Sequence, residues 1–401
     1  MTVPAGGGGG VLGARKPLYR CIPEIHVTRL SASSSLRPKL GLLLLFVVLL
    51  VTLCLAGVPL VTKVLVPLVH SRSRPQPALI LGLDQALLEA SGASDKSFVT
   101  SAALTQASLR ALAKWSLGET RQDLIKFTNS SQIQGAQRTV PGIEFDHLFL
   151  VPGQQAKADI VSKDNNLELL DFRVREAGQQ VADWWREHGL LDEKQLWNGK
   201  LDNSQLVGLA YAKVTLNLGV PVTGTSHGIV DGKGEMPMLM VQGDFLREVT
   251  EEGTTVVIEG ASEELDLCLV LHNKKTSLAA RLPNTNQCSS FGLRKSRLAI
   301  ILPCFEVSSR VALKESLSKT GMKSVFSETA DFSLISHQRG LTLGELFQVV
   351  SFNLKPAEEK LEVTQKGVEE VIFDRPFAML VKQRTTNLTI ISGQVWDHKA
   401  K

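Results

Sequence analysis

Two runs of β-forming residues near the end of the chain, on either side of a charged segment, constrain the fold most strongly. The first run, LTLGELFQVVSFNLK, covers residues 341–355, and the second lies within residues 371–395. Both are rich in Val, Phe, Ile and Leu, which is typical of buried strands. The segment between them contains mostly Glu, Lys and other polar residues. We therefore expect strands on both sides of a charged connection.

An apolar run near the N-terminus, from Leu40 to Thr62, is uncharged over about the length that a bilayer requires. A buried core helix is the alternative, but core helices are usually amphipathic. Six basic residues precede the run against one acid, Glu24, so the positive-inside rule places this side in the cytosol. We expect a single-pass type II signal anchor. The rival interpretation is a signal peptide cleaved after Ala56, which would release a secreted protein.

The apolar run divides the chain into four parts. Residues 1–39 contain a glycine run and a Ser-rich patch that cannot bury a core, so we expect a disordered cytosolic tail. Residues 40–62 form the anchor and residues 63–77 a short stalk. Residues 78–401 form one folded domain on the lumenal or extracellular side of the membrane.

The cysteines of the folded domain do not define a disulfide framework. Cys268, Cys288 and Cys304 are three, so at most one intramolecular bridge forms and one thiol is left over. Which pair is bridged stays open. The triplets beginning at Asn129 and Asn387 are N-glycosylation sequons, which fits a lumenal domain.

No motif predicts an enzyme, a cofactor or a metal site. Residues 224–228, GTSHG, match the G-x-S-x-G nucleophile elbow, but a glycine-rich stretch follows where that motif needs a helix. We expect a polar loop there. The eight histidines lack metal-ligand spacing, and neither a P-loop nor H-E-x-x-H is present. A formal net charge of +4 without a basic, aromatic-rich stripe excludes a nucleic-acid partner.

Hydrophobic periodicity predicts a mixture of helices and strands. Helices are expected over residues 78–90, 105–117 and 174–188, and strands over 147–151 and 158–161. In the third helix, one face collects Val174, Ala177, Val181 and Trp184, so we expect that face to be buried. Of the adjacent Trp184 and Trp185, we expect one in the core and one at its rim.

Several further motifs, in a consistent order, resemble those of the serpin family. They are KWSLGET (114–120), MPMLMVQGDF (236–245), LAIILPCF (298–305), VFSETADFS (325–333) and FDRPF (373–377). The resemblance implies an α+β fold with large, mainly antiparallel β-sheets and surrounding helices, here preceded by one transmembrane helix. It also implies that residues 341–354 and 377–395 lie in different sheets.

The resemblance further identifies the charged connection as a shortened serpin reactive loop. A serpin inhibits when its cut loop inserts into the main sheet as an extra strand, which requires length and small, uncharged side chains. Here Pro356 falls where the strand should extend, and proline cannot donate to a ladder. Charged residues then stand where small ones are needed, namely Glu358, Glu359, Lys360 and Glu362. The predicted loop region also includes Lys366 and Gly367.

Three functions remain open at this stage, and none of them is enzymatic. The favoured one is a divergent, non-inhibitory, membrane-anchored glycoprotein that binds or scaffolds an unknown protein partner on the lumenal or extracellular side. The second is a serine-type endopeptidase inhibitor. The third is a carrier of a small apolar ligand or hormone.

Overall fold

The computed structural model describes the greater part of the predicted folded domain. The described residues are 83, 86–87, 96–128, 140–154, 156–171, 176–188, 204–229, 235–262, 264–273, 288, 292–337, 339–356 and 367–395. The predicted tail, anchor and stalk, residues 1–77, lie outside them, as do Asn129 and residues 357–366. Within these ranges, no helix has both the length and the apolar character that a membrane span requires.

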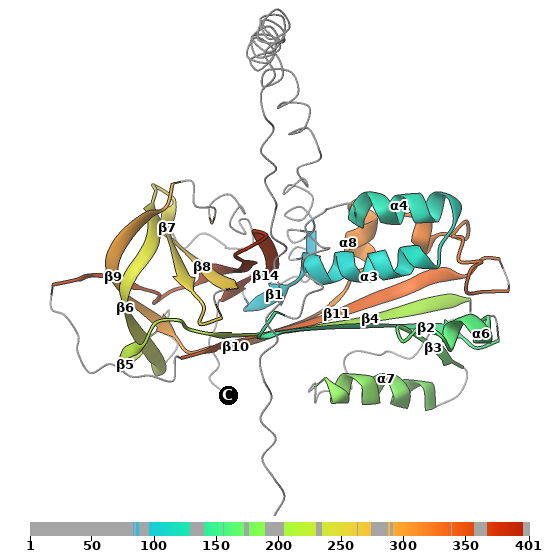
Figure 1. The fold of residues 1–401 in the computed structure, drawn as a ribbon, viewed down its shortest axis with the longest axis horizontal. Helices are drawn as coiled ribbons and strands as arrows, with labels where there is room; N and C mark the ends of the chain where they lie inside the picture. Colours follow the sequence, from blue (N-terminus) through green and yellow to red (C-terminus); the bar gives the residue numbers. More distant parts are fainter. Residues whose placement is uncertain are drawn as a thin grey trace, which may run out of the picture. The chain divides into compact units, whose positions relative to one another are not determined.

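A five-stranded sheet forms one half of the framework (Figure 1). Its order is β10 (Glu306–Ala312), β11 (Thr342–Lys355), β4 (Gln205–Asn217), β2 (Ile143–Pro152) and β3 (Leu167–Leu170). The pairs β11–β4 and β2–β3 are parallel, and the other two pairs are antiparallel. The prediction of mainly antiparallel sheets is therefore wrong for this sheet. Strands far apart in sequence, such as β4 and β11, are not joined by a hairpin and are free to pair in parallel.

A nine-stranded sheet forms the other half. Its order is β1 (Phe98–Thr100), β14 (Leu388–Val395), β13 (Phe377–Gln383), β8 (Leu265–His272), β7 (Gly253–Glu259), β6 (Glu235–Val249), β9 (Arg294–Pro303) and β12 (Glu369–Ile372), with β5 (Val222–Ile229) paired to β6. Only the β12–β9 pair is parallel. Strand β11 thus lies in one sheet and β13 and β14 in the other, which confirms the prediction for residues 341–354 and 377–395.

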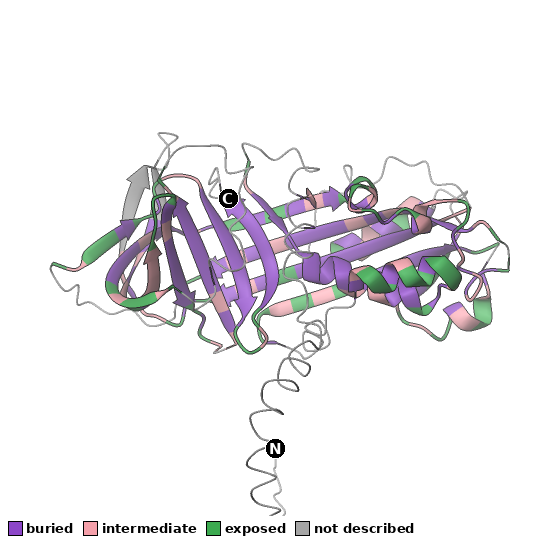
Figure 2. Ribbon diagram, turned by 90° about the horizontal axis from the view of Figure 1, so that it is seen from above, coloured by how far each residue is buried: buried purple, intermediate pink, exposed green. Residues whose placement is uncertain are grey.

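Helices cover both faces of the five-stranded sheet (Figure 1). On one face lie α3 (Ala102–Lys114), α4 (Gly118–Thr128), α8 (Lys314–Lys319) and the short helix η3 (Ser324–Phe326), whereas α7 (Glu176–Glu187) lies on the other. Ser101 caps α3, because its hydroxyl accepts a hydrogen bond from Leu104 N at 3.0 Å. The main core fills the space between these elements, and Figure 2 shows buried positions running along both sheets.

Three local predictions are wrong. Residues 158–161 form a helix, α6 (Ala158–Val161), because a short apolar run does not by itself distinguish helix from strand. Residues 224–228 lie in β5 rather than in a loop, because pairing with β6 outweighs their glycine content. On α7, Trp185 rather than Trp184 is fully buried, since it continues the four-residue spacing of Ala177 and Val181. One tryptophan is nevertheless in the core and the other at its rim.

The cysteine question is also resolved. Cys268 and Cys288 form a disulfide, and Cys304 is the free, half-buried thiol. The sequence alone left three pairings open, because spacing carries no information on which sulfur atoms meet.

Gln348, a fully buried polar residue of strand β11, connects this strand to the start of α3. Its Oε1 accepts hydrogen bonds from Thr100 Oγ1 (3.0 Å) and Ser101 N (3.2 Å). Its Nε2 donates to Ser101 O (2.8 Å) and Thr105 Oγ1 (2.7 Å). The Ser101 hydroxyl in turn donates to Ile390 O of β14 at 2.6 Å. All four bonds of the amide are formed in a fully buried site, so this network fixes the position of β11.

Replacing Gln348 with Leu is expected to destabilise the domain by about 2 to 4 kcal/mol, because buried hydroxyl and backbone groups lose their partners. Denaturant unfolding measures this free energy. The exposed Gln180 of α7 is the matched control, and its replacement with Leu should change stability by about 0.5 kcal/mol or less. Equal effects of the two substitutions would contradict the structural role of the network.

Candidate functional site

The boundary between β11 and β4, here called the β4–β11 seam, is continuous along the full length of β4. Thirteen residue pairs run in parallel from Thr342 and Gln205 to Lys355 and Asn217, with one shift of register between Leu343 and Glu345. Packing across the seam is close, because a Cβ on Gly208 would lie 2.5 Å from the Leu346 side chain. At the far end, Leu218 N donates to Lys355 O at 3.0 Å. The seam is therefore closed up to the point where the predicted loop begins.

Helix α7 covers one face of the seam. Its Ala177, Val181 and Trp185 pack in a buried cluster that contains residues from both strands of the seam. These are Val207, Leu209 and Tyr211 of β4 and Val349 of β11. The end of the helix is attached to the neighbouring β2 as well, since His188 Nε2 lies 3.0 Å from an Asp146 carboxylate oxygen. The Gln348 network lies on the opposite face, so both faces of the seam are covered.

The two strands that lead into and out of the predicted loop, the end of β11 and β12, are here called its first and second stems. The first stem ends at Pro356. Lys355 and Pro356 are exposed, whereas the preceding Leu354 is buried and its N donates to Phe305 O at 3.3 Å. Proline has no N–H to continue the ladder, which is consistent with β11 ending at Lys355.

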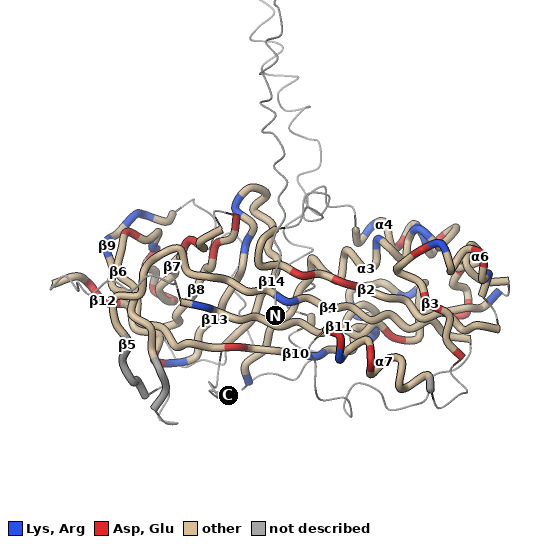
Figure 3. Tube along the Cα trace, turned by 60° about the horizontal axis from the view of Figure 1, so that its bottom comes forward, with Lys and Arg blue, Asp and Glu red and all other residues tan. Residues whose placement is uncertain are grey.

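The second stem of the loop is strand β12, held at the edge of the nine-stranded sheet. Arg247 of β6 binds Glu369 through two hydrogen bonds of 2.6 Å, one to each carboxylate oxygen. Acidic positions on β12 and basic positions on β9 lie at the same end of this sheet (Figure 3). The Arg247 hydrogen bonds hold the pKa of Glu369 below its ordinary value. A bidentate pair of this kind fixes orientation more than it adds stability at an exposed site.

An aromatic cluster connects the two stems. Phe305 lies 5.6 Å from Phe352 of β11 and 5.7 Å from Phe377 of β13, measured between ring centroids. Phe373, which follows β12, lies 5.1 Å from Phe377. Arg375 between them donates from Nε to His272 O at 3.0 Å. The stems are therefore held by core packing, independently of the residues in the loop.

The predicted site residues are described only at the two ends of the loop. Pro356 is exposed at the end of β11, and Gly367 lies in an exposed turn with a φ of +80°, which favours glycine. Glu358, Glu359, Lys360, Glu362 and Lys366 lie outside the described residues, as does Asn129. Asn387 is exposed in the turn between β13 and β14, with a φ of 56°.

This geometry opposes insertion of the loop into the seam. Only residues 356–368 separate β11 from β12, as many residues as β4 alone contains. An inserted strand would need that whole length, plus a reversing turn of about two or more residues. It would also separate β4 and β11 to about twice their spacing of roughly 4.8 Å, breaking the pairs of the seam and the cluster under α7.

Neither the Gln348 network nor the Arg247–Glu369 pair was predicted from the sequence. A single glutamine within LFQVVSF is a weak signal of a buried polar network, because strand alternation alone would place it on either face. Arg247 and Glu369 are far apart in sequence, and only the fold brings them together.

Among the described residues, no group of three His, Cys, Asp or Glu side chains could hold a metal ion.

Comparisons with known proteins agree with this architecture. Residues 231–398 match a family model described as serpin (serine protease inhibitor). Chicken (Gallus gallus) neuroserpin is 24% identical over 188 residues, covering 41% of this chain and 46% of the relative. Plasminogen activator inhibitor 1 from Neovison vison is 25% identical over 269 residues, covering 58% and 64%. The chain thus spans less than two thirds of the length of these relatives.

Solved structures match over a larger part of the chain. Mouse protein-Z dependent protease inhibitor aligns with a TM-score of 0.64 and 14% identity, covering 81% of this chain and all of that one. Native protease nexin-1, solved with heparin, aligns with a TM-score of 0.64 and 16% identity, covering 80% and 99%. The two sheets, the helices around them and the stems of the loop define a serpin fold. The chain belongs to the serpin superfamily.

Replacing Glu369 with Gln is expected to loosen β12 while leaving global stability nearly unchanged, because the pair is exposed. Hydrogen exchange of the β12 amides measures this effect. The neighbouring Glu370→Gln is the control, since its side chain points to the other face of the strand.

The same contact predicts a pH dependence. A carboxylate whose pKa is lowered in the folded state stabilises that state at pH values above its ordinary pKa of 4.5. This contribution is lost as the pH falls through the lowered pKa. The difference in β12 protection between the native protein and Glu369→Gln should therefore disappear in acid. A difference that persisted in acid would contradict the role of the ion pair.

Proposed function

We propose that this chain is a serpin-fold binding protein that does not inhibit proteases by inserting its loop, and that displays its folded domain on the lumenal or extracellular side of a membrane. The observation that carries the proposal is the continuous β4–β11 seam, paired over thirteen residues and covered on both faces. A loop cut by a protease could enter between β4 and β11 only by breaking the pairing of these two strands.

The composition of the loop supports the same conclusion. A strand inserted between β4 and β11 must turn alternate side chains towards the core on one face and towards α7 on the other. The sequence offers Glu358, Glu359, Lys360 and Glu362 for these positions. Burying one such charge without a partner costs several kcal/mol, and no single contact of the inserted strand would offset that cost.

The membrane anchor is supported by sequence and by cysteine chemistry. The run from Leu40 to Thr62 has the length and the basic N-terminal flank of a type II signal anchor. The Cys268–Cys288 disulfide is typical of a lumenal or extracellular domain. Cleavage after Ala56 would leave the same domain in the same compartment, but secreted.

Protease inhibition is the competing function. It is favoured by the family description and by relatives such as plasminogen activator inhibitor 1, whose name states that activity. A short loop on fixed stems could also bind a protease reversibly, without being inserted. The carrier hypothesis stays a prediction from the sequence.

Cutting the chain within residues 356–368 is expected to leave the melting temperature of the folded domain nearly unchanged, because the cut segment cannot enter the sheet. Limited proteolysis followed by thermal unfolding of the nicked protein measures this. A rise of tens of degrees after nicking would mean that the loop inserts, and the inhibitor function would then be restored.

The two functions also differ in their products. Incubation with serine proteases that cut after Lys is expected to give only nicked chain and free enzyme. The decisive measurement is whether a covalent complex resistant to SDS forms. It is made with the native chain and with the Glu358→Ala/Glu359→Ala/Lys360→Ala/Glu362→Ala variant. A complex formed only by the variant would show that the charges block insertion; a complex with the native loop would overturn the proposal.

A glycan at Asn387 would indicate that the folded domain had entered the lumen of the secretory pathway. Thr389, which the sequon requires, is buried in β14, so modification is expected to precede closure of the β13–β14 hairpin. Glycosidase treatment of protein from mammalian cells should increase gel mobility, and Asn129→Gln with Asn387→Gln should abolish the shift. Protein that is unmodified and fully digestible by protease in the cytosol would contradict the topology.

A further inference from the structure

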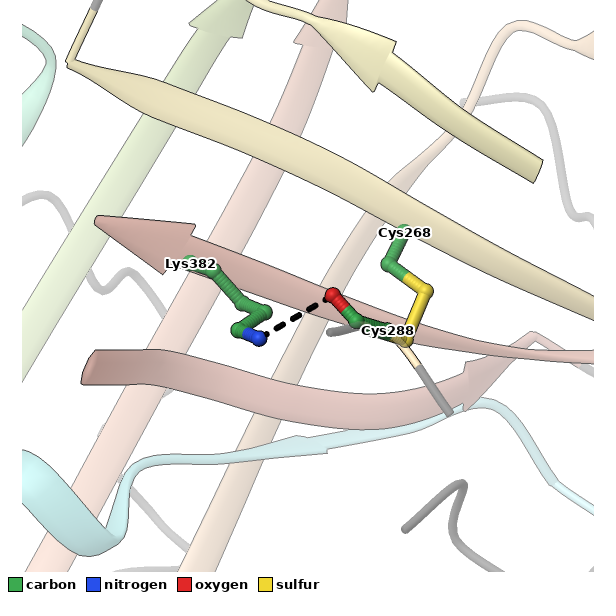
Figure 4. Close-up of a disulfide and its surroundings, with 3 residues drawn as sticks. All are labelled: Cys268, Cys288 and Lys382. Carbon is green, nitrogen blue, oxygen red and sulfur yellow. Dashed lines mark hydrogen bonds between the residues drawn. A yellow bond between two sulfur atoms is a disulfide. The ribbon is translucent and has the colours of Figure 1, made fainter. Parts of the chain in front are cut away.

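Strand β13 contains a lysine inside the core. The Lys382 residue is 3% exposed, in a strand whose other residues are all buried. Its ammonium donates a hydrogen bond to the backbone oxygen of Cys288 at 3.1 Å (Figure 4). No other acceptor for this ammonium is found among the described residues. Burying an ammonium is costly, so the one acceptor that the described part of the chain offers it must be held in place.

The acceptor is held by the Cys268–Cys288 disulfide. Leu380 and Lys382 of β13 pair with Cys268 and Asp266 of β8, so all four side chains leave the same face of the sheet. Cys288 reaches this face from a separate part of the chain, and its bond to Cys268 is the covalent link between them (Figure 4).

The surroundings offer the ammonium little compensation. The side chains packed around the disulfide are apolar and include Val257, Val270, Ala378 and Leu380. The nearest carboxylate, Asp266, already accepts hydrogen bonds from Arg384 at 2.6 and 3.0 Å. Burial lowers the pKa of Lys382, and the attraction of Asp266 counters this only in part. The Cys288 oxygen is therefore the main group that satisfies this lysine.

We propose that the Cys268–Cys288 disulfide is a redox-sensitive support for the burial of Lys382, so that its reduction loosens strand β13 and exposes the lysine. A dithiol supplies two electrons and two protons, the S–S bond breaks into two thiols, and the dithiol becomes a disulfide. No bond to Lys382 forms or breaks. Once Cys288 is free to move away from β8, the ammonium loses its acceptor and the hairpin opens towards water.

Burial of the two cysteines protects the Cys268–Cys288 bond from direct attack by thiols in solution. Cys268 is completely buried and Cys288 is 7% exposed, so a thiolate reaches the bond only after local opening. The free Cys304 lies beside the backbone of Leu354, outside the apolar cluster around the disulfide.

The test compares thermal unfolding of oxidised and reduced protein in the native chain and in Lys382→Met. The methionine keeps the length of the side chain but needs no acceptor. Reduction should lower the melting temperature of the native chain at least twice as much as that of Lys382→Met. Lys295→Met, in the same sheet but exposed, should behave as the native chain does. Equal losses in all three proteins would overturn the proposal.

A second measurement uses the native chain alone, in case Lys382→Met does not fold. An amine-reactive reagent with mass-spectrometric detection should label Lys382 in reduced protein and leave it protected in oxidised protein, with Lys295 labelled equally in both. Alkylation of Cys268 and Cys288 verifies that reduction is complete. If Lys382 stays protected while both thiols are alkylated, the disulfide does not support its burial and the proposal is wrong.

Discussion

The parallel pairing of β11 with β4 is the constraint on which the rest of the domain depends. It joins two strands that are distant in sequence, and it is covered by α7 on one face and by α3 with the Gln348 network on the other. Because hydrogen bonds, apolar packing and a buried polar network all act on the same pair of strands, separating them would cost all three at once. The pairing of β4 with β11 is therefore the part of this sheet that is hardest to open.

Buried polar groups set the positions of the strands that matter most. Gln348 places β11 against the start of α3, and Lys382 places β13 against the disulfide-linked Cys288. Apolar packing alone would tolerate small shifts of either strand, since contacts between aliphatic side chains are not directional. A hydrogen-bonded amide or ammonium in the core tolerates none without losing a partner. Gln348 therefore specifies where β11 lies against α3, and Lys382 ties β13 to the turn residue Cys288.

The sequence predicted the superfamily and the separation of the two C-terminal strand runs into different sheets. The first succeeded because several motifs occur in a consistent order, and the second because the strand runs are long and apolar. The role of the connection between them, including Pro356 and Gly367, stays a prediction. Prediction from the sequence failed at Ala158–Val161, where a short run fits either element, and at residues 224–228, where sheet pairing outweighed composition. It also missed contacts such as Arg247–Glu369, because residues so distant in sequence meet only through the fold.

The aromatic cluster of Phe305, Phe352, Phe373 and Phe377 has an evolutionary consequence. It anchors both ends of the connection through side chains that lie outside residues 356–368. Doubling the length of such a loop costs only about 0.6 kcal/mol of chain entropy. Insertions into this segment would therefore cost the domain little chain entropy, so the same anchored frame could carry connections of different length and charge.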